Sequence, residues 1–239
     1  MAPGRLNAEM QVNMMEIAPG IFCLPMDSVN VYLCVDRDGL VLIDAAMPKN
    51  KDKIWAAIQQ VGHDPQRLNR LIITHADIDH AGSAAAIQSA TQATVYAGLD
   101  TAQHLHQGTM PKHMPWLADL ISSWFMRLDV VSELVKMKDG DELPVAGGLR
   151  VLATPGHTLD HMSLYHPATG VLFAGDALNT RKSRVQITPK VITADVAAAN
   201  RSALRLLNLQ PEVIACGHGQ PLNRKQSDWS PLLHQLQNQ

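Results

Sequence analysis

The sequence predicts an α+β protein in which two β-sheets pack face to face, with helices on the outside, in one domain. Two observations lead to this class. Short apolar runs that are typical of strands form meanders, each meander is followed by helical patterns, and this order occurs twice in 239 residues. The chain is also long enough for one large domain with a substantial core, and it has no short-period repeat of the solenoid kind.

The first half of this architecture follows an N-terminal tail. Residues 1–15 are polar, contain Met and lack a regular pattern, so we expect an irregular tail there and a single domain over 16–239. The Asp38-Gly39 pair between two apolar runs is a hairpin signal. Apolar positions at helical spacing predict an amphipathic helix over 49–61. The expected strands of this half span 21–24, 30–35, 39–44, 68–74 and 94–96, and an Ala-rich helix is expected over 80–90.

Residues 100–131 differ in character from the segments around them. Aromatic residues and methionines, among them Trp116, Trp124 and Phe125, cluster there around two prolines. We therefore predict an inserted helical segment. Two readings of the role of residues 110–126 are open: a hydrophobic lid or pocket wall, or a plain helical insertion that packs into the core or forms a dimer surface.

The second half repeats the order of meander and helix. A polar loop is expected over 179–192, and a helix with Asp195 near its start is expected over 194–207. The expected strands span 134–138, 149–154, 162–166, 171–174 and 213–215, and a last helix spans 229–237.

The composition excludes several classes of protein. Twenty basic against 22 acidic residues give a net charge of −2, which is not the pattern of a nucleic-acid-binding protein. Apolar runs are too short to span a bilayer, and the N-terminus has no compact apolar region of the kind found in signal peptides. Three cysteines without zinc-like spacing predict reduced core thiols. We therefore expect a cytoplasmic enzyme.

Four short segments carry the residues with the most informative chemistry. They read LIITHADIDH, TPGHT, FAGDA and CGHG, and each begins or follows an apolar run that reads as a strand. A lone His or Asp is usually just a polar loop residue, but four such segments at strand ends argue against that reading. Nitrogen and oxygen ligands without thiolate suit zinc, iron, manganese or cobalt, and hydrolysis by a metal-bound hydroxide is the leading hypothesis. The candidate ligands, enough for two divalent metals, are His75, Asp77, Asp79, His80, His157, Asp176 and His218.

These motifs resemble those of the metallo-β-lactamase superfamily of αββα metallohydrolases. That family has H-x-H-x-D-H at a strand end, a His after a Pro-Gly turn, an Asp after a strand and a last His in a Gly-His-Gly turn. The match runs over 71–219 and implies the four-layer αββα sandwich of the metallo-β-lactamase fold. It is specific for fold and metal binding but not for substrate.

The resemblance also implies roles for the candidate ligands. His75 and His157 would bind the first metal, and Asp176 would bridge the two metals. Asp79 would also orient the attacking hydroxide and accept its proton, which makes it a candidate catalytic residue. The second metal would be bound by Asp79, His80 and His218.

Asp77 departs from the family pattern, because most members have His at this position. A carboxylate can still coordinate the first metal, so we keep Asp77 as a ligand. Its added negative charge favours harder metals such as iron or manganese over zinc. The opposite reading is that Asp77 only forms a hydrogen bond to a ligand, which would leave the first site weak.

The resemblance narrows the reaction to hydrolysis of a small-molecule ester, lactone or thioester. Lactamases of this superfamily keep Cys or Ser where Asp176 stands. Lactonases have a catalytic Tyr where this chain has Asn179, which could donate a hydrogen bond to a carbonyl oxygen. Zinc is the first expectation for the two metals, with iron or manganese as the alternatives. The alternative function is a metal-binding pseudoenzyme or binding module, which Asp77 and Asn179 suggest.

Two neighbouring features have their own readings. Arg181, Lys182 and Arg184 follow Asp176 in a loop, and they form either a solvated charged loop or a clamp for an anionic group. His161 lies four residues after His157 and resembles a second His that is common in this family's turn. We expect it to support the ligands rather than to bind metal.

Overall fold

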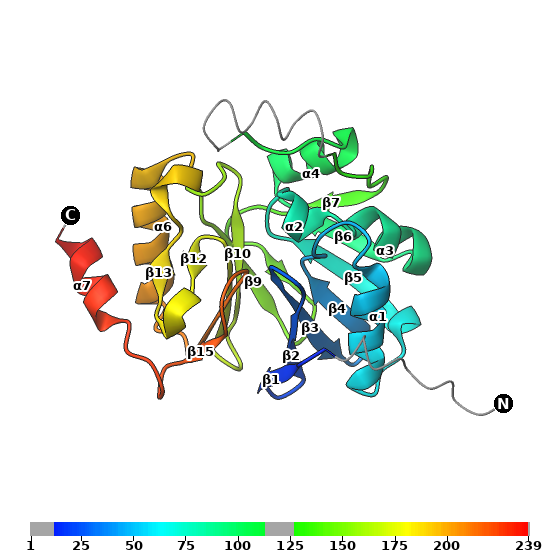
Figure 1. The fold of residues 1–239 in the computed structure, drawn as a ribbon, viewed down its shortest axis with the longest axis horizontal. Helices are drawn as coiled ribbons and strands as arrows, with labels where there is room; N and C mark the ends of the chain where they lie inside the picture. Colours follow the sequence, from blue (N-terminus) through cyan, green and yellow to red (C-terminus); the bar gives the residue numbers. More distant parts are fainter. Residues whose placement is uncertain (1–11, 113–126, 239) are drawn as a thin grey trace.

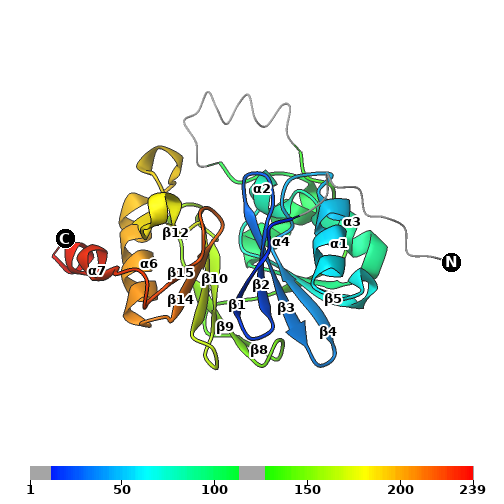
Figure 2. The ribbon, with the colours of Figure 1, turned by 60° about the horizontal axis from the view of Figure 1, so that its bottom comes forward.

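A computed structural model describes residues 12–112 and 127–238 of the chain. Two β-sheets face each other in the middle of the molecule, and helices lie on the outer side of each (Figure 1). Figure 2 shows the same layers from another direction, with α1 and α3 outside one sheet and α6 and α7 outside the other. The α+β class and the αββα layering predicted from the sequence are confirmed.

The first sheet holds seven strands in the order of the chain. Its first four strands are antiparallel neighbours, and the pairs from β4 to β7 are parallel. Parallel neighbours need crossover connections, which contain α1 (Lys51–Gln60), α3 (Ala84–Thr91) and α4 (Leu99–Gln107). The strands are β1 (Met15–Ala18), β2 (Ile21–Pro25), β3 (Asn30–Asp36), β4 (Gly39–Ile43), β5 (Leu68–Ile73), β6 (Thr94–Ala97) and β7 (Leu134–Lys136).

The second sheet has the order β15-β14-β11-β10-β9-β8. Its central pair, β11 and β14, is parallel and is connected through α6 (Val196–Asn208), whose N-terminus is capped by Asp195. A small third sheet pairs β12 (Leu178–Asn179) with β13 (Gln186–Ile187), and α7 (Ser230–Gln237) lies near the end of the chain. The main strands are β8 (Glu142–Leu143), β9 (Leu149–Ala153), β10 (Met162–His166), β11 (Val171–Gly175), β14 (Val213–Cys216) and β15 (Leu222–Asn223).

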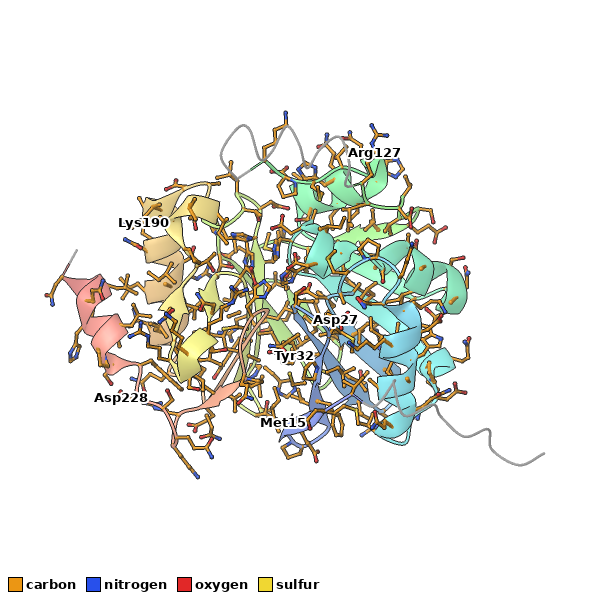
Figure 3. All side chains as sticks on the ribbon, in the orientation of Figure 1. Met15, Asp27, Tyr32, Arg127, Lys190 and Asp228 are labelled. Atoms are coloured by element: carbon orange, nitrogen blue, oxygen red, sulfur yellow. The ribbon has the colours of Figure 1, made fainter. Side chains whose placement is uncertain are left out.

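The core between the sheets is built from alternate residues of facing strands. Tyr32 of β3 and Phe173 of β11 make an edge-to-face contact with ring centroids 5.4 Å apart. Figure 3 shows Tyr32 near the middle of the molecule, with Met15, Lys190 and Asp228 at its periphery. Fully burying a side chain of this size contributes about 1.5–3 kcal/mol, so this core fixes the relative position of the two sheets. Separate apolar clusters lie between each sheet and its own helices.

Some predicted elements differ from the structure. The helix expected over 80–90 is two helices, α2 (Ile78–Ala81) and α3, separated by Gly82 and Ser83. Gly82 keeps helical backbone angles, and the helical conformation is interrupted at Ser83, with φ −100° and ψ 6°. The two-residue strands β8 and β15 were not expected, and the loop predicted over 179–192 contains β13.

The structure describes only part of the predicted tail and of the predicted insertion. Met15, expected at the end of the irregular tail, already belongs to β1, while residues 1–11 lie outside the described part of the chain. Within 100–131, α4 occupies the first residues and 113–126 lie outside the description, including Trp116, Trp124 and Phe125. In the described ranges, every helix is too short or too polar to cross a membrane.

Candidate metal centre

The four motif segments meet at one edge of the two sheets. His75 follows β5, His157 follows β9, Asp176 follows β11 and His218 follows β14. The parallel pairing of β11 with β14 brings their carboxyl ends to the same edge. The backbone N–H of Met162 donates to the carbonyl of Thr74 at 3.0 Å, which joins the second sheet to the end of β5. Residues far apart in the sequence therefore face one another there.

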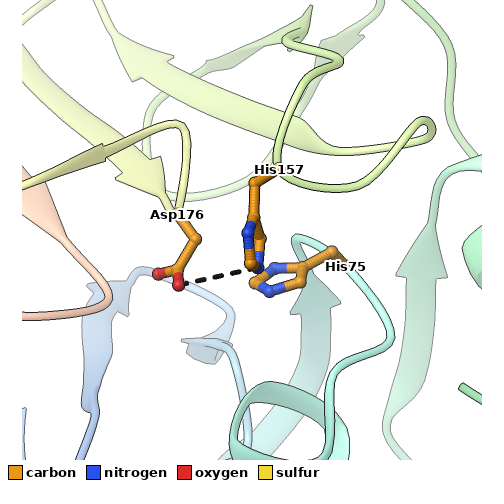
Figure 4. Close-up of side chains that lie close together, drawn as sticks. All are labelled: His75, His157 and Asp176. Carbon is orange, nitrogen blue, oxygen red and sulfur yellow. Dashed lines mark ion pairs between the residues drawn. The ribbon is translucent and has the colours of Figure 1, made fainter. Parts of the chain in front are cut away.

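One group of possible metal ligands comprises His75, His157 and Asp176. One donor atom from each lies within 4.8 Å of the others, and all three side chains are buried. Figure 4 shows the two imidazoles and the carboxylate converging from three different elements, with His157 Nε2 and Asp176 Oδ2 3.8 Å apart. This is the set that the sequence assigned to the first metal and the bridge.

A second group comprises Asp79, His80 and His218, whose donor atoms also lie within 4.8 Å of one another. Asp176 contacts this group as well, because its Oδ1 is 3.3 Å from His80 Nε2 and its Oδ2 is 3.2 Å from His218 Nε2. The carboxylate of Asp176 therefore lies between both groups, as a bridging ligand would.

Asp77 lies beside the first group. Its Oδ2 is 3.0 Å from His157 Nε2 and 3.5 Å from His75 Nε2. Asp77 is the residue immediately before α2, so the start of this helix directs its side chain. Both sequence readings, a ligand and a hydrogen-bond partner of ligands, fit this position, and direct coordination stays a prediction.

The protein orients the four histidines through their Nδ1 atoms. His157 Nδ1 donates to the carbonyl of Ile192 at 2.6 Å, and His218 Nδ1 donates to the carbonyl of Ser28 at 2.7 Å. A carbonyl only accepts, so each of these Nδ1 atoms donates a hydrogen, and Nε2 is the nitrogen that faces the carboxylates. This leaves Nε2 ready to bind a metal.

Asp44 orients the other two histidines, and the sequence analysis did not identify it. Its buried carboxylate accepts hydrogen bonds from His80 Nδ1 at 2.8 Å and from Thr74 Oγ1 at 3.0 Å. Thr74 Oγ1, having donated its own hydrogen, accepts one from His75 Nδ1 at 3.0 Å. The only sequence signal was the position of Asp44 at the end of a predicted strand, at the edge where the motif segments lie.

The electrostatics of the site favour a cation. Burial alone would lower the pKa of His80, but the carboxylates of Asp176, Asp44 and Asp79 together raise it well above its ordinary value. Burial alone would raise the pKa of Asp176, but His80 and His218 hold it well below its usual range. The central carboxyl is therefore ionised at neutral pH. Metal binding would release the protons that the histidines hold without metal.

The residues present fit two divalent metal ions. Among the described residues, the buried atoms His75 Nε2, His80 Nε2 and Asp176 Oδ1 have no hydrogen-bond partner. Buried polar atoms of this kind are costly unless something binds them, and these three point into the groups described above. Imidazole and carboxylate donors suit zinc, iron or manganese.

The remaining candidates lie around this centre. Asn179 is buried in β12, where its side-chain amide donates to the carbonyl of Ile187 at 3.1 Å, so its proposed contact with substrate stays a prediction. Arg181, Lys182 and Arg184 are exposed. His161 is fully buried, and its Nε2 accepts a hydrogen bond from the backbone N–H of Asp176.

A sandwich of this kind, with imidazoles and carboxylates gathered at one sheet edge, defines a metal-binding protein of the αββα class. The model of the metallo-beta-lactamase superfamily matches residues 24–218. The chain belongs to this superfamily of metallo-hydrolases.

Similar proteins support the same assignment. A probable metallo-hydrolase of Bacillus subtilis, YflN, is 30% identical over 244 residues, which cover 92% of both chains. A hydroxyacylglutathione hydrolase of Idiomarina loihiensis is 28% identical over 145 residues, which cover 60% of this chain and 43% of the other. The structure of a B3 metallo-beta-lactamase with an active-site glutamic acid has a TM-score of 0.74 at 23% identity and covers 95% of this chain and 87% of its own. This last likeness concerns the fold alone.

Proposed function

We propose that this protein is a hydrolase that uses two divalent metal ions, zinc before iron or manganese, to cleave an ester, lactone or thioester bond in a small-molecule substrate. The observation that carries the proposal is the position of Asp176, whose carboxylate contacts histidines of both ligand groups. The hydrolases among the similar proteins, one of them named for an acyl-glutathione substrate, support the type of reaction.

Each metal would have its own set of residues. His75, His157 and Asp77 would hold the first ion, and Asp176 would contact both ions. Asp79, His80 and His218 would hold the second ion. When bound, the two ions would supply Lewis acidity that acidifies water and polarises a carbonyl group.

The residues of the chain would perform the remaining work. The carboxylate of Asp79 is 26% exposed, more than the neighbouring ligands, so it can meet a water molecule and accept its proton. The carbonyls of Ile192 and Ser28 and the carboxylate of Asp44 hold the imidazoles in one tautomer throughout. Asn179 could assist the substrate oxygen only with the amide hydrogen that is not donated to Ile187.

A second candidate function is a metal-binding module without catalysis. Two positions motivate it: Asp77 replaces the common histidine, and Asn179 replaces the tyrosine of lactonases. A cytoplasmic location, a small-molecule substrate and a homodimer belong to the proposal as expectations.

A substrate screen separates the two functions. Aryl esters, lactones and thioesters would be incubated with protein loaded with zinc, iron or manganese, beside Asp176→Ala and the surface control Lys225→Ala. We expect metal-dependent turnover of at least one class by wild type and by Lys225→Ala, and none by Asp176→Ala. Stoichiometric metal binding without turnover of any class would instead favour the binding module.

A further inference from the structure

The backbone turns sharply where Asp176 leaves its strand. Gly175 has a φ of +51°, and the pairing of β11 with β14 shifts register between Phe173 and Gly175. The space beside this turn is filled, because a Cβ atom on Gly175 would lie 2.6 Å from His161 Nε2. The direction of the Asp176 side chain depends on this turn, and the imidazole of His161 packs directly against it.

A chain of hydrogen bonds leads away from the turn and returns to it. The backbone N–H of Asp176 donates to His161 Nε2 at 2.9 Å, and His161 Nδ1 lies 2.8 Å from Thr154 Oγ1. Thr154 Oγ1 lies 2.8 Å from Ser163 Oγ, which donates to the carbonyl of Ala174 at 3.2 Å. The chain thus begins at residue 176 and ends at residue 174.

Both ends of this chain impose the same direction on its hydrogens. A backbone N–H can only donate, so His161 Nε2 must accept and the proton of the neutral imidazole must lie on Nδ1. A backbone carbonyl can only accept, so Ser163 donates to Ala174 and accepts from Thr154. Thr154 then accepts from His161 Nδ1. Both ring nitrogens of His161 are thus engaged in hydrogen bonds, which leaves neither of them for a metal.

The surroundings keep this arrangement closed to solvent. His161, Thr154 and Ser163 are each 0% exposed. Water therefore does not compete for the hydrogen bonds of the network.

We propose that His161, Thr154 and Ser163 form a positioning network that fixes the turn at Gly175 and thereby aims the Asp176 carboxylate at both ligand groups. The inference rests on the proposed function, because the aim of Asp176 matters only if it bridges two metals. Such supporting hydrogen bonds typically change metal affinity by about 10- to 100-fold when they are removed.

The test uses four variants and manganese as the probe. Thr154→Val and Ser163→Ala each remove one hydroxyl group from the series of hydrogen bonds and change the shape of the side chain little. His161→Leu removes the acceptor for the N–H of Asp176. His161→Gln supplies a side-chain oxygen in place of Nε2 and should rescue. Thr91→Val, which removes a hydroxyl-to-carbonyl hydrogen bond at the end of α3, is the control.

The measurements are the two manganese affinities and the electron paramagnetic resonance spectrum. Wild type, His161→Gln and Thr91→Val should bind two ions and give the signal of an exchange-coupled manganese pair. His161→Leu, Thr154→Val and Ser163→Ala should bind the second ion about 10- to 100-fold more weakly and lose the coupled signal. A loss of thermal stability alone would not produce this difference between Gln and Leu.

Two failures are distinguishable. If wild type binds two manganese ions and Thr154→Val and Ser163→Ala match its affinities and coupled signal, the network is overturned and the two-metal hydrolase stands. These two variants decide the matter even if His161→Leu does not fold. If wild type binds no pair of ions, with manganese or with zinc, the proposed function falls, and this inference falls with it.

Discussion

Which nitrogen of each histidine carries the proton decides whether this site can bind metal. Nδ1 of His157 and of His218 donates to a carbonyl, and Nδ1 of His80 faces the Asp44 carboxylate. Nε2 is therefore the nitrogen that faces the ligand groups. Asp44 orients two of the four histidines. Its carboxylate accepts a hydrogen bond from His80 directly, and it holds His75 through the hydroxyl of Thr74.

Asp44→Asn should weaken metal binding although residue 44 touches no metal. An amide at this position presents its own hydrogens to donors, so it can no longer accept from both His80 and Thr74. We expect metal affinity to fall by about 10- to 100-fold, measured by competitive titration with a chelating dye. The matched control is the exposed Asp38→Asn, and equal affinities in both variants would contradict the role of Asp44.

Asp176→Ala should abolish activity more completely than Asp77→Ala. The Asp176 carboxylate contacts both ligand groups, whereas Asp77 lies beside His75 and His157 of the first group. Metal content and turnover of the two purified variants, compared with wild type, check this ranking. Equal residual activity and equal metal content in both variants would show that Asp176 does not bridge.

Asp77→His should shift the metal preference toward zinc. The change removes one negative charge and supplies an imidazole, a ligand that suits zinc better than it suits hard metals. With less ligand charge to offset the metals, bound water becomes more acidic, so the acidic limb of the pH–rate profile should move to lower pH. Competitive titration with zinc and manganese measures the first effect and a pH–rate series the second. No change in either would mean that Asp77 does not reach the metal.

The sequence could predict the ligands but not the residues that orient them. His75, Asp77, Asp79 and His80 lie within six residues, so their spacing reveals them locally. The hydrogen bond from His80 to Asp44 spans 36 positions, and that from His218 to Ser28 spans 190. Such contacts depend on how the strands pair, which no local spacing encodes.

The candidate metal ligands follow the ends of the strands rather than their middles. Atoms are closely packed there, so a larger side chain would not fit. Gly217, just after β14, has ordinary backbone angles, but a Cβ atom there would lie 2.4 Å from Asp176 Oδ1 and 2.5 Å from His80 Cε1. The side chains of the site, and not the backbone angles, therefore exclude any residue larger than glycine at position 217.

Gly217→Ala should damage the metal centre more than the fold. The added methyl group must displace Asp176 or His80, and overpacking of this kind costs about 1–3 kcal/mol. We expect metal affinity to fall sharply while the far-ultraviolet circular dichroism spectrum is retained. Gly62→Ala is the control, because its φ of +86° strains an alanine although no atom lies within 4 Å of the added carbon. Similar loss of metal in both variants would contradict the argument.

The sequence could predict the longer strands of both sheets, because buried strands have a strong apolar signal. It did not predict the short or interrupted elements. β8 and β15 have two residues each, too few for any period to appear. The break between α2 and α3 lies at Ser83, whose hydroxyl donates to the carbonyl of Met47, 36 positions away. Packing between distant segments overrode the local helical pattern there.

The two halves of the chain each hold part of the metal centre. The first half supplies His75, Asp77, Asp79 and His80, and the second supplies His157, Asp176 and His218. The centre exists only because the core between the sheets, which includes Tyr32 and Phe173, holds these halves together. The sequence predicted this pairing through the order of its strands and motifs, but the distances between donors come only from the packed structure.

The most direct test of the two-metal centre is an anomalous-scattering map from crystals grown with zinc. We expect two zinc peaks about 3.5–4 Å apart, one beside His75 and His157 and the other beside His80 and His218, with the Asp176 carboxylate reaching both. A single peak, or two peaks of which Asp176 touches only one, would contradict the central claim.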